Sequence, residues 1–231
     1  MPAQKPKTRQ RRERGSISSD QIIEGAFAVI KDSSVESLSM PELARRLDVG
    51  VTSIYWYFRR KEDLLRAMSD RALAILYTQL PDPADFGDWR TFIETYQRTT
   101  REILTQDPAL ADLILVRQNS YSLAAGINAF RSVDRNLQAL IDAGFAPLQA
   151  WRLLSAVTTF TNGMILAART ATMNDAVTLD ERQTLLITDE MPALTDLVRT
   201  EKIQLAMVSD EDFETGLAAL LDGFERQLEK S

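Results

Sequence analysis

The 231-residue chain contains no cysteine and no histidine, which excludes disulfide frameworks, thiolate metal sites and acid–base catalysis by histidine. Its formal net charge is −6, but residues 1–61 hold 12 Lys and Arg against 7 Asp and Glu, a net charge of +5, so the remainder carries −11. A basic head on an acidic body is typical of polyanion binding, although basic tails are often simply solvated.

The rest of the composition predicts a helical, cytoplasmic protein. With 9 Gly, 8 Pro and 45% apolar residues, the chain has few helix breakers and enough apolar surface for a sizeable core. No alternating β-branched stretch is long enough to indicate a sheet. No apolar run approaches the roughly 20 residues of a membrane span, and the basic N-terminus lacks the apolar region of a signal peptide. We therefore expect an all-α fold, with no metal site and no cofactor.

Two capping boxes mark the starts of the first two helices. Ser18 with Gln21, and Ser39 with Glu42, have the spacing at which each side chain can bond the other's backbone N–H. The segment LDVG ends the second helix, because Asp48 tolerates a left-handed conformation and Gly50 can cap the next helix. Apolar stripes follow the boxes: Ile22, Ile23, Ala26, Phe27 and Ile30, then Met40, Leu43, Ala44 and Leu47.

A third short helix is expected from Val51 to about Phe58, so the second and third helices form a helix-turn-helix. Ile54 and Phe58 are i, i+4 neighbours on its buried face, next to Val49. The second helix of such a motif enters the major groove of DNA, where hydroxyls and rings can contact phosphates, sugars and base edges. The outward residues are Thr52, Ser53, Tyr55 and Tyr57.

The aromatic residues of this helix have two interpretations. Tyr55, Trp56 and Tyr57 can face DNA, or they can pack the helix against its neighbours, and for Trp56 both interpretations stay open. Lys61 begins the fourth helix, where its ammonium and the N-terminal N–H groups could meet one phosphate. The basic and aromatic residues together predict a DNA-facing surface.

Long helices are expected in the rest of the chain. The segment LPDPADFGD at 80–88 is a break, although the helix before it can pack on both sides of that break. Gly144 fits a helix C-terminus, and residues 170–190 form a polar connection. The expected helices run over 61–79, 89–106, 108–117, 122–143 and 147–170, with a shorter helix near Pro192 and a last helix over 210–230.

Two of these helices carry side chains with more than one possible role. The last helix has an apolar stripe that can contact both the body and a partner chain, or can complete the core of a monomer: Phe213, Leu217, Leu220, Leu221, Phe224 and Leu228. The helix from Pro147 places polar residues within an apolar run: Thr158, Thr159, Thr161 and Asn162. They fit a small-molecule cavity, but they could equally bond the preceding helical turn or line a dimer interface.

The segment SMPELARRLDVGVTSIYWYFRRKEDLL resembles the DNA-binding domain of the TetR family of bacterial transcriptional regulators. The segments DAGFAPLQAWRLLSAVTTFTNGMILA and FETGLAALLDGFERQLEK resemble the C-terminal domain of the tetracycline-repressor branch, so the resemblance covers nearly the whole chain. Asp48 and Gly50 depart from the Gly and Ser common in the turn, without blocking the fold. The resemblance implies a basic arm over 1–17, a helix-turn-helix domain over 18–64, and a ligand-binding and dimerisation domain over 65–231.

The resemblance also implies functional residues. The DNA-binding set is Ser39, Thr52, Ser53, Tyr55, Tyr57 and Lys61. The ligand-binding set is Tyr77, Tyr96, Thr100, Asp112, Leu115, Arg117, Asn136, Trp151, Leu154, Thr158 and Asn162. Tetracycline repressors hold their drug as a magnesium chelate with a His and a Glu, whereas this chain has Asp112 and Ala167 near those positions. A more apolar or aromatic ligand is therefore expected.

Together these features predict a homodimeric repressor that binds a palindromic DNA operator and is released by a small-molecule effector. The resemblance implies that the dimer forms through a four-helix bundle, to which each subunit contributes its last helix and the helix around Leu153 to Ile165. Two alternatives belong to other classes. One is a protein-binding helical bundle with an incidental basic tail. The other is a helical enzyme, which the missing His, Cys and Gly-rich phosphate loop disfavour.

Overall fold

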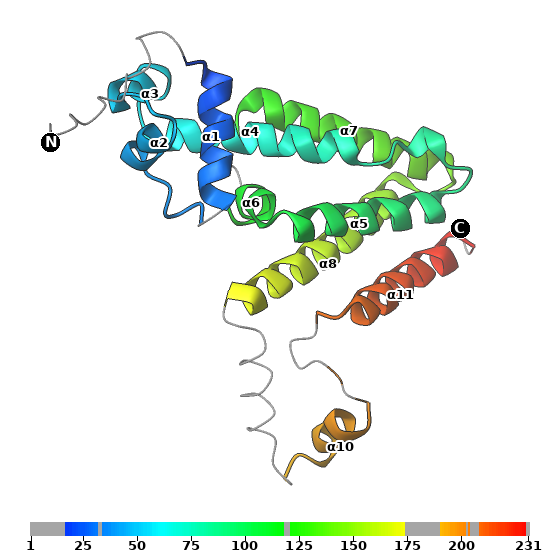
Figure 1. Ribbon diagram of the computed structural model, residues 1–231. Coiled ribbons are helices and arrows are strands. Elements are labelled where there is room, and N and C mark those ends of the chain that lie inside the picture. The colour runs from blue at the N-terminus through cyan, green and yellow to red at the C-terminus, as the bar shows by residue number, and fades with distance from the viewer. Residues whose placement is uncertain are drawn as a thin grey trace, which may run out of the picture.

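The computed structural model describes residues 17–31, 34–117, 121–173, 190–201, 203 and 208–229. Across these residues every extended regular element is a helix, which confirms the all-α prediction (Figure 1). The expected basic arm lies outside the described residues except for Ile17, and so does most of the polar connection over 170–190. Within the described part of the chain, no helix is long and apolar enough to cross a membrane.

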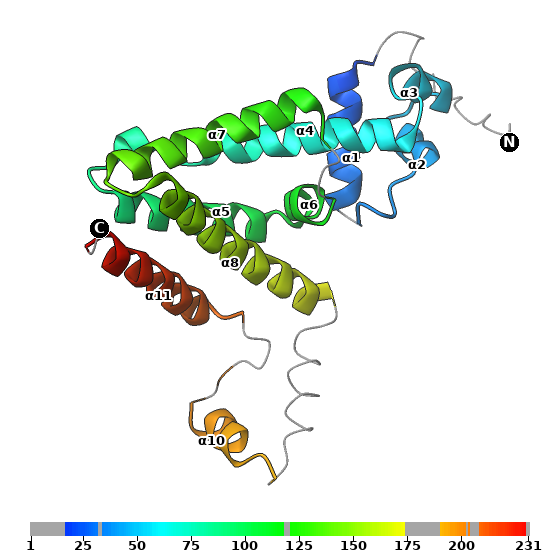
Figure 2. The same ribbon diagram turned by 180° about the vertical axis from the view of Figure 1, so that it is seen from behind.

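Three short helices gather at one end of a long one to form the head (Figures 1 and 2). They are α1 (Ser19–Lys31), α2 (Met40–Arg46) and α3 (Val51–Tyr57), and the long helix is α4 (Lys61–Gln79). The first capping box is confirmed, because Gln21 N donates to the Ser18 hydroxyl at 3.2 Å and Ser18 N donates to Gln21 Oε1 at 3.0 Å. The second box is half formed. Glu42 N donates to Ser39 Oγ at 3.3 Å, but the Glu42 carboxylate pairs with Arg45.

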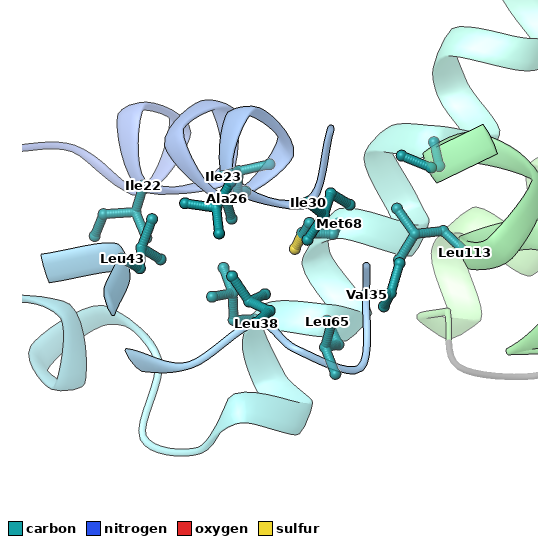
Figure 3. Close-up of a cluster of buried hydrophobic side chains, with 14 of the residues drawn as sticks. Ile22, Ile23, Ala26, Ile30, Val35, Leu38, Leu43, Leu65, Met68 and Leu113 are labelled. Atoms are coloured by element: carbon teal, nitrogen blue, oxygen red, sulfur yellow. The ribbon is translucent and has the colours of Figure 1, made fainter. Parts of the chain in front are cut away.

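The core of the head joins these helices to the body. Figure 3 shows the side chains of α1, α2 and α4 pointing toward one another around Leu38 and Met68, with Leu113 of the body beside them. The expected inward residues of α1 and α2 are buried, except that Phe27 and Leu47 are partly exposed. Because Leu65 and Met68 lie in this core, the expected boundary after residue 64 falls inside a continuous helix.

The body is built from long helices that surround a second core. In both views α7 lies alongside α4, and α11 lies alongside α8 (Figures 1 and 2). The helices are α5 (Trp89–Gln106), α6 (Pro108–Ala111), α7 (Leu123–Asp142), α8 (Pro147–Met173), α10 (Pro192–Thr200) and α11 (Asp210–Leu228). The second core combines apolar side chains of α5, α7, α8 and α11. Gly144 ends α7 with φ +104°, as expected for a helix C-terminus.

One expected helix differs from the structure. Residues 108–117 do not form one α-helix, because α6 ends at Ala111 and passes into a π-helical segment, η2 (Asp112–Val116). The i→i+5 bond that defines such a turn joins Arg117 N to Asp112 O at 3.1 Å. Two of its residues, Ile114 and Leu115, face a cavity in the body. Single-turn π segments are frequent at functional sites.

Ion pairs hold α11 against α5. Arg90 donates to Asp222 and Glu225, both at 2.6 Å. Arg98 binds Glu214 at 2.7 Å, and Arg101 lies 4.7 Å above the ring of Phe213. Partly exposed pairs contribute modestly one by one, but a row of them fixes the register of the two helices.

Candidate functional site

The turn before α3 places that helix as the sequence predicts. Asp48 adopts the left-handed conformation with φ 55°, and Gly50 is the N-cap of α3 in an extended conformation. Val49 N closes the turn by donating to Ala44 O at 3.0 Å. Ile54 and Phe58 are buried, with exposed fractions of 0% and 8%. Residues 40–57 therefore form a helix-turn-helix whose second helix is anchored by one face.

The opposite face of α3 is unusually aromatic. Trp56 is 77% exposed, Tyr55 is 44% exposed and Tyr57 is 36% exposed. The Trp56 ring packs edge-to-face on Tyr57 with 4.6 Å between centroids. The core-packing interpretation of Trp56 is thus wrong, and the sequence analysis omitted this residue from the DNA-binding set. Its position between two outward tyrosines was the signal that pointed to this face.

Besides Ser39, which caps α2, two residues of the predicted DNA-binding set bond within the head through their side chains. The Tyr57 hydroxyl donates to Ile17 O at 2.7 Å, which ties the recognition helix to the chain just before α1. The Lys61 ammonium donates to Glu36 O at 2.8 Å and keeps two further N–H donors. Thr52 is exposed and Ser53 is partly exposed on the same helix, whereas Ser39 is exposed at the start of α2. Contact of these residues with DNA stays a prediction.

A cavity of about 330 Å³ lies between the helices of the body, and several residues of its α8 wall, Trp151 among them, are exposed. Its walls come from α4, α5, η2, α7 and α8. The lining residues are Leu76, Tyr77, Leu80, Tyr96, Gln97, Thr100, Leu104, Ile114, Leu115, Val133, Asn136, Trp151, Leu154, Ser155, Thr158, Thr159 and Asn162. Their mixture of aliphatic, aromatic and hydroxyl or amide side chains is typical of a small-molecule site.

Nine of the eleven residues predicted to bind ligand line this cavity, and two do not. The nine are Tyr77, Tyr96, Thr100, Leu115, Asn136, Trp151, Leu154, Thr158 and Asn162. Asp112 and Arg117 lie outside the lining. The carboxylate of Asp112 instead binds Arg169 of α8 through two hydrogen bonds of 2.9 and 3.1 Å. This pair lines a smaller cavity of about 200 Å³ between α6, α8 and the end of α1.

The electrostatics of the main cavity keep its phenols protonated. Burial, with smaller contributions from Tyr96 and Tyr121, raises the pKa of the Tyr77 hydroxyl to about 12. Burial also raises the pKa of Tyr96, although hydrogen bonds with Ser132 and Asn136 oppose this rise. Both rings can therefore donate a hydrogen bond to a ligand at neutral pH.

Two polar lining residues, Gln97 and Ser155, were not predicted from the sequence, and Thr159 was only one of the polar residues of α8 with several possible roles. Gln97 is 2% exposed and Ser155 and Thr159 lie on α8, and all three line the cavity. Ser155 and Thr159 were one and two helical turns from residues already selected, so helical periodicity could have found them. Thr161 faces elsewhere, and its buried hydroxyl has no partner among the described residues.

An apolar groove follows the outer side of α8 and α11. Its lining includes Ala156, Phe160, Ala219 and Leu220, together with three residues shared with the cavity, namely Trp151, Ser155 and Thr159. Phe160 packs over Gly216 so closely that a Cβ there would lie 2.4 Å from its ring. One face of α8 thus borders both the cavity and the groove.

Comparisons with known proteins agree with this architecture. The family model described as "Bacterial regulatory proteins, tetR family" matches residues 22–68, and that described as "Tetracyclin repressor-like, C-terminal domain" matches residues 80–228. An HTH-type transcriptional repressor of Mycobacterium tuberculosis is 36% identical over 98% of this chain and 87% of its own length. The class C tetracycline repressor of Escherichia coli is 30% identical over 91% of both chains.

A solved structure extends the likeness to three dimensions. A possible TetR family transcriptional regulator from Streptomyces coelicolor has a TM-score of 0.70 and 26% identity over 90% of this chain and 99% of its own. The helix-turn-helix head, the helical body and these relatives lead to one assignment. The chain belongs to the TetR family of bacterial transcriptional regulators and is a regulator rather than an enzyme.

Proposed function

We propose that this protein is a homodimeric repressor that binds a palindromic operator and is released by a small, largely apolar or aromatic ligand. The observation that carries the proposal is α3, which buries Ile54 and Phe58 and leaves the Tyr55, Trp56 and Tyr57 rings exposed. Exposure of three aromatic side chains on a recognition helix is unfavourable unless a partner surface covers them. DNA offers sugars, thymine methyl groups and phosphates to such a face.

In this proposal the head comprises residues 18–64, preceded by the basic arm over 1–17, and the body comprises residues 65–231. The arm contains six Lys and Arg against a single Glu, which favours contact with phosphates. Thr52, Ser53, Tyr55, Tyr57 and Lys61, with Ser39 at the edge, would contact the operator, and we add Trp56 to this set.

Dimerisation would use the groove between α8 and α11. Ala219 is exposed on α11, and Leu220 beside it is partly buried against the second core; both line the groove. A second copy that places the same two helices there forms a four-helix bundle, in which each subunit meets the same surface of its partner. Two heads held in this way could read two half-sites about one helical turn apart, roughly 34 Å.

The main cavity would bind the effector, and α4 would transmit its effect. Tyr77 and Leu76 of α4 line the cavity, whereas Leu65 and Met68 of the same helix lie in the head core. A ligand acts as a switch if it binds the state with wrongly spaced heads better than the DNA-bound state. The name of the class C tetracycline repressor points to drug-responsive repression in that relative, and the geometry here supports a comparable switch with a different ligand.

The test begins with the operator. DNA fragments selected from a random pool by the purified protein should converge on a palindrome, and its binding should weaken steeply between two salt concentrations. Sedimentation of the complex should give two chains per operator. Selection that yields no common sequence, with weak binding to all DNA, would favour the protein-binding bundle instead.

A further inference from the structure

The polar groups of the main cavity share one property, which is that they carry no charge. Nine lining side chains offer a hydroxyl or a carboxamide, and Trp151 offers an indole N–H. Among the described residues that line the cavity, none is Asp, Glu, Lys or Arg. Asp, Glu, Lys and Arg make up 60 of the 231 residues of this protein, so a cavity wall of this size that contains none of them is notable.

The charged residues near the cavity form ion pairs with residues outside its lining. Asp112 is occupied by Arg169 on the far side of η2. Arg101 of α5 pairs with Asp210 at 2.8 Å. Arg135 of α7, beside the lining residue Asn136, is 63% exposed at its side chain and lies 3.7 Å from Asp82. The positive charge of Arg135 slightly opposes the rise in the pKa of Tyr96 that burial causes. A cation outside the cavity wall therefore affects the phenol less than burial does.

We propose that the effector is an electrically neutral, planar aromatic molecule with hydrogen-bonding oxygens, bound without a metal ion or a counter-ion from the wall. The proposal rests on the cavity being the effector site of the proposed function. Transfer of an ion from water into a mostly apolar site is unfavourable unless an opposite charge meets it there. The rings of Tyr77, Tyr96 and Trp151 can attract a cation, but this attraction offsets only a fraction of the hydration free energy that the cation loses on entering the cavity.

The hydrogen-bonding groups suit oxygen atoms of a ligand, and the rings of Tyr77, Tyr96 and Trp151 suit a flat aromatic skeleton. Tyr77 can donate a hydrogen bond, because its phenol is protonated at any ordinary pH. Asn162 and Thr158 lie one turn apart on α8, and Tyr96 and Thr100 line the same cavity from α5. Hydroxyls and carboxamides both donate and accept, so carbonyl and hydroxyl oxygens of a ligand can be paired without any net charge.

The proposal is tested with three anthraquinones that share one skeleton: 2-hydroxymethylanthraquinone, anthraquinone-2-carboxylate and 2-aminomethylanthraquinone. Their binding to the full-length protein is measured at pH 7 by tryptophan fluorescence and by thermal melting, without DNA. The neutral alcohol should bind at least about tenfold more tightly than either ion. Equal or tighter binding of the carboxylate or the ammonium would overturn the neutral assignment. Failure of all three to bind would overturn the planar aromatic assignment.

A negative charge placed in the wall should shift the preference toward the ammonium compound. Asn162→Asp, which keeps the shape of the side chain, should bind the ammonium compound at least about tenfold more tightly than the wild type does. Asn128→Asp, on the exposed face of α7, is the matched control and should leave all three affinities unchanged. Operator release is measured separately. Neutral-selective binding without release would confirm the preference of the cavity for neutral ligands but would remove the effector role from the proposed function.

Discussion

Removal of one oxygen atom, in Tyr57→Phe, separates the two roles that the structure gives to Tyr57. The hydroxyl donates to Ile17 O at 2.7 Å, and Ile17 is 5% exposed, so its carbonyl would lose a partner in a largely buried position. A hydrogen bond of this kind contributes about 0.5–1.5 kcal/mol to stability. For a chain of this length the melting temperature should fall by roughly 2–4 °C per kcal/mol.

The effect on DNA should be different. Because the hydroxyl already serves Ile17, Tyr57→Phe keeps the exposed ring and should change operator affinity by less than about threefold. Tyr57→Ala removes the ring and its edge-to-face contact with Trp56, and should weaken operator binding by about 10- to 100-fold while also lowering the melting temperature. Operator affinity is measured by fluorescence anisotropy, and stability by thermal unfolding of the free protein.

Tyr55→Phe is the control, because the Tyr55 hydroxyl makes no hydrogen bond to another described residue and the ring is 44% exposed. It should melt as the wild type does. A Tyr57→Phe protein that also melts as the wild type would refute the link to Ile17. A Tyr57→Ala protein with wild-type operator affinity would show that this face of α3 is not the DNA surface.

Three further predictions concern the head, the groove and the cavity. Lys61→Met should weaken binding to all DNA alike and lower the slope of log affinity against log salt by about one unit, measured by anisotropy. Gly216→Ala should destabilise the dimer by about 1–3 kcal/mol, because the new Cβ would lie 2.4 Å from the ring of Phe160. Gly223→Ala is the control and should not destabilise it, because a Cβ there meets no atom within 4 Å. Sedimentation and denaturation of the two variants measure the difference. The pKa of Tyr77 is raised from 10.0 to about 12 on folding, so its neutral form stabilises the protein below pH 10 and this contribution, up to about 2.7 kcal/mol, is lost as pH rises toward 12. Tyr77→Phe should therefore show a smaller alkaline loss in urea unfolding, and an unchanged alkaline slope would contradict the buried position of this phenol.

Helix bounds could be predicted where local chemistry decides them. Lys61–Gln79 and Trp89–Gln106 have the expected bounds, because an Asp, Pro and Gly cluster separates them and Asp88 caps the second helix through Thr91 N at 2.8 Å. The left-handed Asp48 was predictable for the same reason. In such segments a few neighbouring residues determine the conformation.

The π-helical segment could not be predicted, because partners distant in sequence stabilise it. Asp112 at its start binds Arg169, which is 57 residues away, and the Ser69 hydroxyl of α4 approaches Leu113 O at 3.4 Å. The pair with Arg169 explains why the Asp112 carboxylate does not line the cavity. A resemblance aligns residues along the chain, but the extra residue in a π turn changes which side chains face inward.

The outward face of α3 was easier to predict than the cavity lining. Ile54 and Phe58 define the buried side of a short helix, so the opposite side follows from geometry. Trp56 was the ambiguous residue, since its size favours burial and its position favours exposure. For the cavity, nine residues selected by resemblance line it and helical periodicity extends the set on α8 to Ser155 and Thr159, whereas Gln97 required the packing of five elements to be known.

Helix α4 connects the cavity to the head, so the proposed switch requires that the ligand stabilise one position of this helix. Tyr77 at one end of α4 lines the cavity, Ser69 in the middle approaches η2, and Lys61 at the other end holds Glu36 O in the head. To move a two-state equilibrium from 99:1 to 1:99, the ligands must favour the released state by about 5.5 kcal/mol in total. A dimer has two cavities, so each ligand needs to supply about half of this, equivalent to a preference of about a hundredfold for one state. A neutral ligand can reach that preference through a change in packing against Tyr77 and η2 alone, because a displaced aromatic contact and one lost hydrogen bond together are of this size.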